Sequence, residues 1–337
     1  MYRSFSPRYI YWELCNHCNL KCKHCFANCS PHKESFMDIS VVLSRINEIN
    51  SVNKVPIRFG GGEPFLYPDF DKLLHFYAQK QFPLAITTNG TLINNENIRL
   101  LCDCNLQTIT VSIDGLEGCN DSLRGIGNFK RACKGLDIAL NNGLAVSLSF
   151  TVTSWNYPDL FQYVKYFYRK GIKDFYFFRY IPDEMGVRAN DLLLDAYTLL
   201  IVSKEIEQIK QHYSDIKLKY EKRSFFSFLI NNEYKSKNIE CNFRKRIITV
   251  KYDGSIVVCA AISKVLGNIL YDDFFEIEEK INREINSINC IPIECRNCQY
   301  VLNCRGGCKS YSYQQHKNYE HKDASCFLQI YKFLEKG

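Results

Sequence analysis

The sequence predicts an α/β protein whose N-terminal part is a partial (β/α)6 barrel, similar to a TIM barrel. Two observations lead to this prediction. Apolar runs of strand length alternate with segments of helical period up to about residue 213. After that point the alternation stops and cysteines become frequent, although the whole chain has 17 of them in 337 residues. Six βα units imply a parallel sheet with right-handed crossovers, and six are fewer than the eight of a closed barrel.

The individual elements follow from local composition. Strands are expected where β-branched and aromatic residues cluster between turn residues, at Tyr9–Cys15, Val55–Gly60, Leu84–Thr88, Thr108–Ile113, Ala145–Thr153 and Asp174–Tyr180. Helices are expected where apolar residues recur every three to four positions, at Asp38–Asn50, Asp69–Lys80, Asn94–Leu101, Phe129–Asn142, Tyr157–Arg169 and Asp191–His212. These twelve segments form the predicted barrel.

The pattern divides the chain into three parts: a barrel at 1–213, a bridging region at 214–240, and a cysteine-rich domain at 241–337. In the last part, Ile247–Val258 resembles a hairpin that turns at Asp253-Gly254. Residues 290–326 look like loops, and Ser325–Leu334 has the pattern of a closing helix.

Composition excludes several classes of protein. With 46% apolar and 23% charged residues, the chain is an ordinary globular protein rather than a disordered one. It has neither a secretory signal nor an apolar run long enough to span a membrane, so we expect a cytoplasmic protein with no membrane partner. The net charge of +7 comes without basic–aromatic repeats, so we expect no nucleic-acid partner. Many cysteines in an intracellular chain favour metal binding over disulfides.

A first group of cysteines, Cys18, Cys22 and Cys25, follows the first strand in the segment CNLKCKHC. Three thiolates at this spacing can bind one soft metal centre and leave a metal position open. A structural zinc site needs four ligands, which His17 or His24 could complete. From spacing alone, both zinc and iron–sulfur remain open.

Three further motifs end the next strands: Gly60-Gly61-Gly62-Glu63-Pro64, Thr87-Thr88-Asn89-Gly90 and Ser112-Ile113-Asp114-Gly115. Each motif alone is a weak turn signal. The carboxyl ends of parallel strands lie at one edge of the sheet, so together the motifs outline one pocket beside the cysteines. Successive glycines there would let backbone groups approach a ligand closely.

With these motifs, residues 9–180 resemble the core of the radical S-adenosylmethionine (SAM) enzymes. CNLKCKHC matches the family's CxxxCxxC motif, Gly61-Gly62-Glu63 its GGE segment, and SIDG with Leu123-Arg124-Gly125 its fourth-strand region. The resemblance implies a [4Fe–4S] cluster held by Cys18, Cys22 and Cys25, whose fourth iron binds SAM. It also implies that Gly61, Gly62 and Glu63 contact the SAM amino group, with Ser112 and Arg124 near its carboxylate. His24 stands where the family often has an aromatic residue.

The second group of cysteines follows a longer pattern. Cys241 and Cys259 flank Gly254, followed by Cys295-x2-Cys298-x5-Cys304-x3-Cys308 and, later, Cys326. Spacing alone fits zinc or iron, but beside a radical SAM core it resembles the SPASM extension, which carries two auxiliary [4Fe–4S] clusters. By this resemblance Cys295, Cys298, Cys304 and Cys326 hold one cluster, and Cys241, Cys259 and Cys308 hold the other. The second set lacks a fourth cysteine, so either an iron stays open for a substrate thiolate, or Cys290 or a non-cysteine group completes it.

The resemblance implies a radical SAM maturase, an oxidoreductase that modifies a ribosomally synthesised peptide. Abstraction of hydrogen by a 5′-deoxyadenosyl radical would lead to a thioether or carbon–carbon cross-link. The alternatives are a peptide epimerase, a sulfatase-type formylglycine-generating maturase, and a zinc-binding scaffold without catalysis. The remaining cysteines are expected to be structural: Cys15, Cys29, Cys102, Cys104, Cys119, Cys133 and Cys290.

The expected partners are a precursor peptide and an electron donor such as flavodoxin or ferredoxin. The chain begins almost at its first predicted strand, which leaves no room for an N-terminal leader-binding module. A leader would then be recognised at the junction of barrel and extension or by a separate leader-binding protein. The excess of positive charge would suit an acidic leader.

Overall fold

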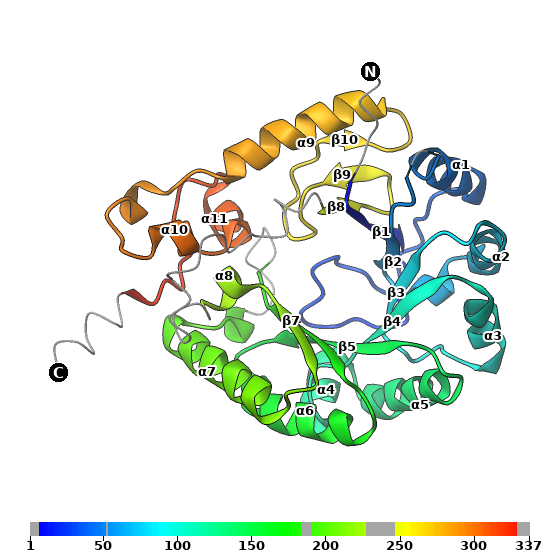
Figure 1. Ribbon diagram of the computed structural model, residues 1–337, viewed down its shortest axis with the longest axis horizontal. Coiled ribbons are helices and arrows are strands. Elements are labelled where there is room, and N and C mark those ends of the chain that lie inside the picture. The colour runs from blue at the N-terminus through cyan, green and yellow to red at the C-terminus, as the bar shows by residue number, and fades with distance from the viewer. Residues whose placement is uncertain (1–6, 52, 183–189, 227–246, 329–337) are drawn as a thin grey trace.

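A computed structural model describes residues 7–51, 53–182, 190–226 and 247–328 of the chain. A curved sheet forms the frame, and helices α1, α2, α3, α5, α6 and α7 line the outside of its curve (Figure 1). The loop after the first strand, drawn in blue, lies inside the curve. The C-terminal helices α9, α10 and α11 lie together at the opposite side from α3 and α5.

The described residues form one ten-stranded sheet in the order β10-β9-β8-β1-β2-β3-β4-β5-β6-β7. Neighbouring strands from β8 through β1 to β7 are parallel, whereas β9 is antiparallel to both β8 and β10. The strands are β1 Tyr9–Cys15, β2 Ile57–Gly61, β3 Leu84–Thr88, β4 Leu106–Ser112, β5 Val146–Val152, β6 Asp174–Arg179, β7 Lys217–Tyr220, β8 Ile247–Val250, β9 Ser255–Val257 and β10 Gly267–Asn268.

The helices between the strands produce the alternation that the sequence predicts, which confirms the partial (β/α) barrel. The helices between the strands are α1 Ile39–Ile49, α2 Phe70–Lys80, α3 Asn95–Asp103, α4 Glu117–Arg124, α5 Asn128–Asn141, α6 Leu160–Arg169, α7 Ala196–His212 and α8 Lys222–Phe225. Three more helices follow the last strand, namely α9 Phe274–Ile288, α10 Val301–Cys304 and α11 Lys309–His316. In the described part of the chain, no helix combines the length and apolar character that a membrane span requires.

The two faces of the sheet differ in chemistry. On the outer face, the rings of Phe59 and of Tyr77 in α2 meet edge to face with centroids 5.6 Å apart. On the inner face hydroxyl groups join neighbouring strands, as between Thr110 and Ser147, whose oxygens are 2.8 Å apart. Because successive strand residues point to opposite faces, the apolar core lies under the helices and the barrel interior is polar.

The structure contains several elements that the sequence analysis did not predict, among them strand β10 and helix α9. Helix α4 was not predicted, because its buried residues, Asn120 and Leu123, give no apolar period. Strand β7 lies in the expected bridging region and extends the sheet beyond six strands.

In the segment expected to be loops, residues 290–326, α10 and α11 are short helices. The buried residues of α11 include Ser310 and Ser312, so apolar periodicity could not reveal this helix. The hairpin is confirmed, because β8 pairs with β9 in the antiparallel sense. Most of the helix expected at Ser325–Leu334 lies outside the described residues.

Candidate active site

The cysteine loop, residues 16–38 between β1 and α1, begins against the end of β2. The amide of Gly62 donates to the Cys15 carbonyl, and that of Glu63 donates to the His17 carbonyl, each at 2.8 Å. A Cβ atom at position 62 would lie 1.8 Å from the His17 oxygen, and Gly61 has φ +107°. These two glycines are therefore needed for a close approach between two segments of the chain itself.

The structure places the three predicted cluster thiols near enough to one another to interact electrostatically. Burial raises the pKa of Cys18 to about 12, and the neighbouring thiols of Cys22 and Cys25 act in the same direction. Each of the three sulfur atoms has an N–H donor: Asn89 Nδ2 for Cys18 at 3.9 Å, Arg124 Nη1 for Cys22 at 4.0 Å, and the Cys29 amide for Cys25 at 3.4 Å.

Glu63 is fully buried behind this loop. Its carboxylate accepts a hydrogen bond from Thr88 Oγ1 at 2.6 Å and from the Asn89 amide at 2.8 Å. Burial raises the pKa of Glu63 to about 7, although these hydrogen bonds act in the opposite direction. The GGE segment and the Thr87–Gly90 motif thus meet at one edge of the sheet, as the sequence predicts.

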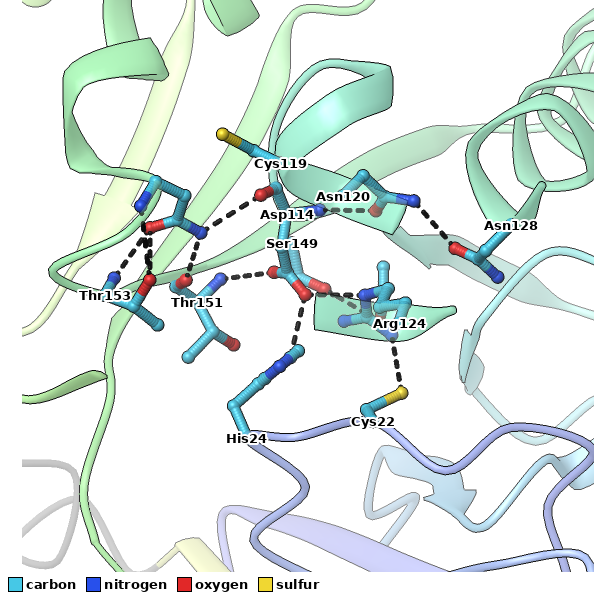
Figure 2. Close-up of polar contacts among 12 residues, drawn as sticks. Cys22, His24, Asp114, Cys119, Asn120, Arg124, Asn128, Ser149, Thr151 and Thr153 are labelled. Atoms are coloured by element: carbon cyan, nitrogen blue, oxygen red, sulfur yellow. Dashed lines mark hydrogen bonds and ion pairs between the residues drawn. The ribbon is translucent and has the colours of Figure 1, made fainter. Parts of the chain in front are cut away.

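Asp114 connects the fourth-strand motif to the cysteine loop (Figure 2). Its Oδ2 accepts from His24 Nε2 at 2.8 Å and from Arg124 Nε at 2.5 Å, and its Oδ1 accepts from the Thr151 amide at 2.6 Å. Although burial opposes ionisation, the Arg124 guanidinium and His24 hold the pKa of Asp114 well below its usual range. The sequence analysis missed Asp114 as a site residue, although it lies in the SIDG motif that pointed to this region.

The two residues expected near the SAM carboxylate are placed differently. Arg124 lies beside the cysteine loop, with one nitrogen near the Cys22 sulfur and another bound to Asp114. Ser112 lies at the end of β4, where its hydroxyl accepts a hydrogen bond from Ser149 at 3.0 Å. Arg124 is thus part of the loop's support as well as a candidate ligand-binding group.

A second group of thiols surrounds a cavity in the C-terminal region. Its walls include the four cysteines expected to share one auxiliary cluster, namely Cys295, Cys298, Cys304 and Cys326. Burial raises the pKa of Cys304 to about 12, and the thiols of Cys326 and Cys295 act in the same direction. The structure thus brings together all four of these sequence-predicted residues.

The other predicted auxiliary set is only partly described. Burial raises the pKa of Cys308 to about 11, and the nearby Cys259 thiol contributes in the same direction. Cys241 lies outside the described residues. The Cys290 thiol donates to the Tyr319 carbonyl at 3.0 Å and accepts from Lys309 Nζ at 3.7 Å.

A buried ion pair joins this region to the barrel. Arg179, at the end of β6, forms two hydrogen bonds with Asp323, at 2.8 and 3.2 Å. Asp323 also accepts from the Cys308 amide at 3.1 Å, and the Arg179 guanidinium stacks 3.9 Å from the centroid of the Tyr311 ring. Sequence analysis missed this pair because 144 positions separate its members and no local motif marks either one.

The cysteines without an assigned role are mostly packed in the fold. Cys15 is buried at the end of β1 and Cys29 is buried in the cysteine loop. The Cys104 thiol donates to the Leu74 carbonyl at 3.4 Å. All sixteen cysteines in the described residues are free thiols.

The donor set at the cysteine loop fits an iron–sulfur cluster. Thiolates bound to iron carry negative charge that N–H donors stabilise, and each of the three sulfurs already has such a donor. Within the described residues no group of three His, Cys, Asp or Glu side chains is arranged around a single metal ion. The thiolates of a four-iron cluster bind different iron atoms, so they need not surround one point.

Comparison with known proteins supports this interpretation. Residues 12–167 match the family model described as the radical SAM superfamily. The chain is 24% identical over 337 residues to an "AdoMet-dependent heme synthase" of Methanosarcina barkeri, an alignment covering 95% of this chain and 96% of the relative. It is 26% identical over 284 residues to the "Antilisterial bacteriocin subtilosin biosynthesis protein AlbA" of Bacillus subtilis, covering 80% of this chain and 59% of AlbA.

The fold of the chain is also found in a solved structure. The crystal structure of Streptococcus suis SuiB bound to its precursor peptide SuiA superposes with a TM-score of 0.77 at 18% identity. The superposition covers 94% of this chain and 75% of SuiB. Residues 12–167 of the chain therefore form a radical SAM domain.

Proposed function

We propose that this protein is a radical SAM maturase that modifies a ribosomally synthesised peptide, with a thioether or carbon–carbon cross-link as the product. The observation that carries the proposal is the second group of thiols, four of which line one cavity beside the barrel. A peptide-modifying extension with auxiliary clusters needs such a group, whereas SAM cleavage needs only the cysteine loop. Two similar proteins support the same proposal. AlbA is a biosynthesis protein of the bacteriocin subtilosin, and SuiB was crystallised with a precursor peptide.

At the barrel, Cys18, Cys22 and Cys25 would hold a [4Fe–4S] cluster, with SAM bound near Gly61, Gly62, Glu63, Ser112 and Arg124. When both are bound, the cluster and SAM would supply a 5′-deoxyadenosyl radical that removes a hydrogen atom from the substrate. The chain's own contribution is a set of complementary charges. The Glu63 carboxylate suits the amino group of SAM and the Arg124 guanidinium suits its carboxylate.

In the extension, Cys295, Cys298, Cys304 and Cys326 would hold one auxiliary [4Fe–4S] cluster. Cys241, Cys259 and Cys308 would hold the second, with an iron left open for a substrate thiolate. Completion by Cys290 is the competing assignment, and the engagement of its thiol with Tyr319 and Lys309 favours the open site. An open iron beside the barrel would give a cysteine of the peptide a fixed position during cross-linking. A flavodoxin or ferredoxin would supply the electron, and a separate leader-binding protein would present a leader.

A second candidate is the modification of an iron porphyrin. The heme synthase of Methanosarcina barkeri aligns over nearly the whole of both chains, which AlbA does not. Epimerisation of a peptide and a sulfatase-type conversion of Cys or Ser are further alternatives that use the same groups. The radical SAM domain at residues 12–167 argues against a zinc scaffold without catalysis.

Anaerobic purification followed by reaction with defined substrates tests the proposal. We expect roughly 8–12 iron atoms per chain, as two or three four-iron clusters require. With SAM and dithionite, a Cys-containing peptide encoded beside the gene should lose two hydrogens by mass spectrometry. An unchanged peptide, together with binding of an iron porphyrin seen by its absorbance, would overturn the peptide assignment in favour of the second candidate. Deuterium uptake without a mass loss would instead indicate epimerisation.

A further inference from the structure

Three consecutive residues of the cysteine loop contact the segment formed by β4, α4 and their connection. The contacts are Arg124 Nη1 to the Cys22 sulfur at 4.0 Å, the Lys23 amide to the Leu123 carbonyl at 2.9 Å, and His24 Nε2 to Asp114 Oδ2 at 2.8 Å. Two of the loop's predicted cluster cysteines, Cys22 and Cys25, lie within or next to this stretch. The geometry of the cysteines therefore depends on how firmly the β4–α4 segment holds residues 22–24.

Asp114 is the centre of these contacts. It is fully buried, one of its oxygens binds both His24 and Arg124, and the other binds the Thr151 amide (Figure 2). Its own amide donates to Asn120 Oδ1 at 3.0 Å, which ties the carboxylate to α4. All of these partners belong to the chain, so the network can form without a bound cluster or SAM.

The chemistry of the site requires a carboxylate. Three N–H groups point at the two oxygens of Asp114, and an ionised carboxylate is an acceptor at both. An asparagine has one acceptor oxygen, so its amide group would face at least one of these donors with an N–H of its own. A buried donor left without an acceptor is costly. Because the Thr151 amide is held in strand β5, the cysteine loop is the part that can move to relieve that cost.

We propose that Asp114 is the positioning residue of the cysteine loop, which fixes His24 next to Cys25 and directs Arg124 to the Cys22 sulfur before any cluster is assembled. The inference rests on the proposed function only for the identity of the group that the loop then holds. Asp114 does not touch that group, and it acts through His24 and Arg124.

The first test measures the loop itself in the full-length, cluster-free protein. Hydrogen–deuterium exchange over residues 18–25 should accelerate at least about tenfold in Asp114→Asn relative to the native protein. Asp137→Asn is the matched control, because Asp137 pairs with Lys170 through an exposed contact away from the loop. Unchanged exchange in Asp114→Asn would overturn the proposal. This readout does not depend on the reaction, so it stands whether or not the peptide assignment is correct.

The second test asks whether Asp114 works through Arg124. In the reconstituted protein, Asp114→Asn and Arg124→Gln should each weaken SAM binding at least about tenfold, and the double variant should bind no more weakly than Arg124→Gln. Multiplied losses in the double variant would mean that Asp114 acts independently, against the proposal. Normal iron content with normal SAM affinity in Asp114→Asn would contradict it as well.

Two variants of His24 test the proposal if Asp114→Asn does not fold. His24→Gln keeps a side-chain N–H that can reach Asp114, whereas His24→Leu has none. Loop exchange should stay near native in His24→Gln and rise about tenfold in His24→Leu. Equal exchange in the two variants would show that the bond to Asp114 does not hold the loop.

Discussion

The two cysteine regions of this protein are each supported by a buried pair of aspartate and arginine, but the pairs are built in opposite ways. At the barrel, Asp114 ends the fourth strand motif and Arg124 follows ten positions later on the next helix. In the extension, Arg179 ends a barrel strand and its partner Asp323 comes 144 positions later, among the cysteines. One pair is local in the chain and the other connects its two halves.

The difference suggests different tasks. A local pair can form when two neighbouring segments fold, so it shapes one loop without involving the rest of the molecule. A distant pair forms only when the extension meets the barrel, so it stabilises their arrangement. The partners agree with this division, since Asp114 also binds His24 of the cysteine loop, whereas Asp323 binds the backbone of Cys308 in the extension.

The largest expected effect is a difference in activity between variants of the two cysteine regions. Cys18→Ala should abolish formation of 5′-deoxyadenosine from SAM, because the barrel cluster would lose a ligand. Under the proposed assignment, Cys295→Ala should retain this SAM cleavage and lose peptide modification, since it would affect only an auxiliary cluster. Chromatography of the nucleoside and mass spectrometry of the peptide check both outcomes. Equal loss of SAM cleavage in the two variants would mean that the regions do not act separately.

The next effect concerns the distant pair. Arg179→Met leaves Asp323 buried without a charged partner and should cost about 3–5 kcal/mol of unfolding free energy. The double variant Arg179→Met/Asp323→Leu removes both charges and should recover only part of that loss, because the Cys308 and Ser325 amides lose their acceptor. Urea unfolding measures the free energies, and iron analysis shows whether the extension still binds its clusters. If Arg179→Met were as stable as the native protein, the distant pair would not stabilise the arrangement of extension and barrel, and the contrast with the local pair would fail.

A third prediction contrasts Asp114 with Glu63, the other fully buried carboxylate of the site. The Arg124 guanidinium and the hydrogen bond from His24 hold the pKa of Asp114 well below its usual range, whereas burial raises the pKa of Glu63 from 4.5 to about 7. The folded protein thus holds the Glu63 proton more tightly than the unfolded chain between those two pKa values. The contribution of Glu63 to the free energy of unfolding is therefore fully present below about pH 4.5. It is lost as the pH rises through about 7, and the total loss is about 3 kcal/mol.

Glu63→Gln should remove this dependence, because glutamine does not titrate. Urea unfolding of the cluster-free native and variant proteins between pH 5 and about pH 8 measures the difference. The free energy of unfolding of the native protein minus that of Glu63→Gln should fall as the pH rises. A difference that rises with pH would contradict the direction of the pKa shift of Glu63.

The smallest effect comes from an exposed pair that supports neither cysteine region. Lys170 and Asp137 are 2.9 Å apart, with side chains 30% and 49% exposed. Asp137→Asn should change the unfolding free energy by less than about 1 kcal/mol, because solvent screens the interaction. A loss as large as that of Arg179→Met would show that burial does not explain the difference between the pairs.

The parts of the fold that depend on local sequence were predictable. Strands β1 and β3 have the predicted bounds, Tyr9–Cys15 and Leu84–Thr88, because apolar runs there end at turn residues. The grouping of the three loop cysteines followed from their spacing, whereas the grouping of Cys295, Cys298, Cys304 and Cys326 followed only from the resemblance to the SPASM extension. The proposed cluster assignments and the domain boundaries remain predictions.

The supporting network was beyond sequence analysis for a physical reason. His24, Asp114 and Thr151 come from three different segments, and only tertiary structure reveals that a carboxylate is shared among them. Helix α4 was missed for a related reason, since Asn120 on its buried face bonds to Asn128 rather than packing as an apolar residue. Buried polar contacts leave no periodic signal in the sequence.

The single sheet has a consequence for how a substrate enters. Strand β8 pairs in parallel with β1 at one side of the barrel, and the Arg179–Asp323 pair fastens the extension to β6 near the other side. Swinging the extension outward as a lid would require breaking both strand pairing and a buried ion pair. The extension therefore does not swing away from the barrel, and under the proposed function a peptide would have to pass beside it to reach the polar interior.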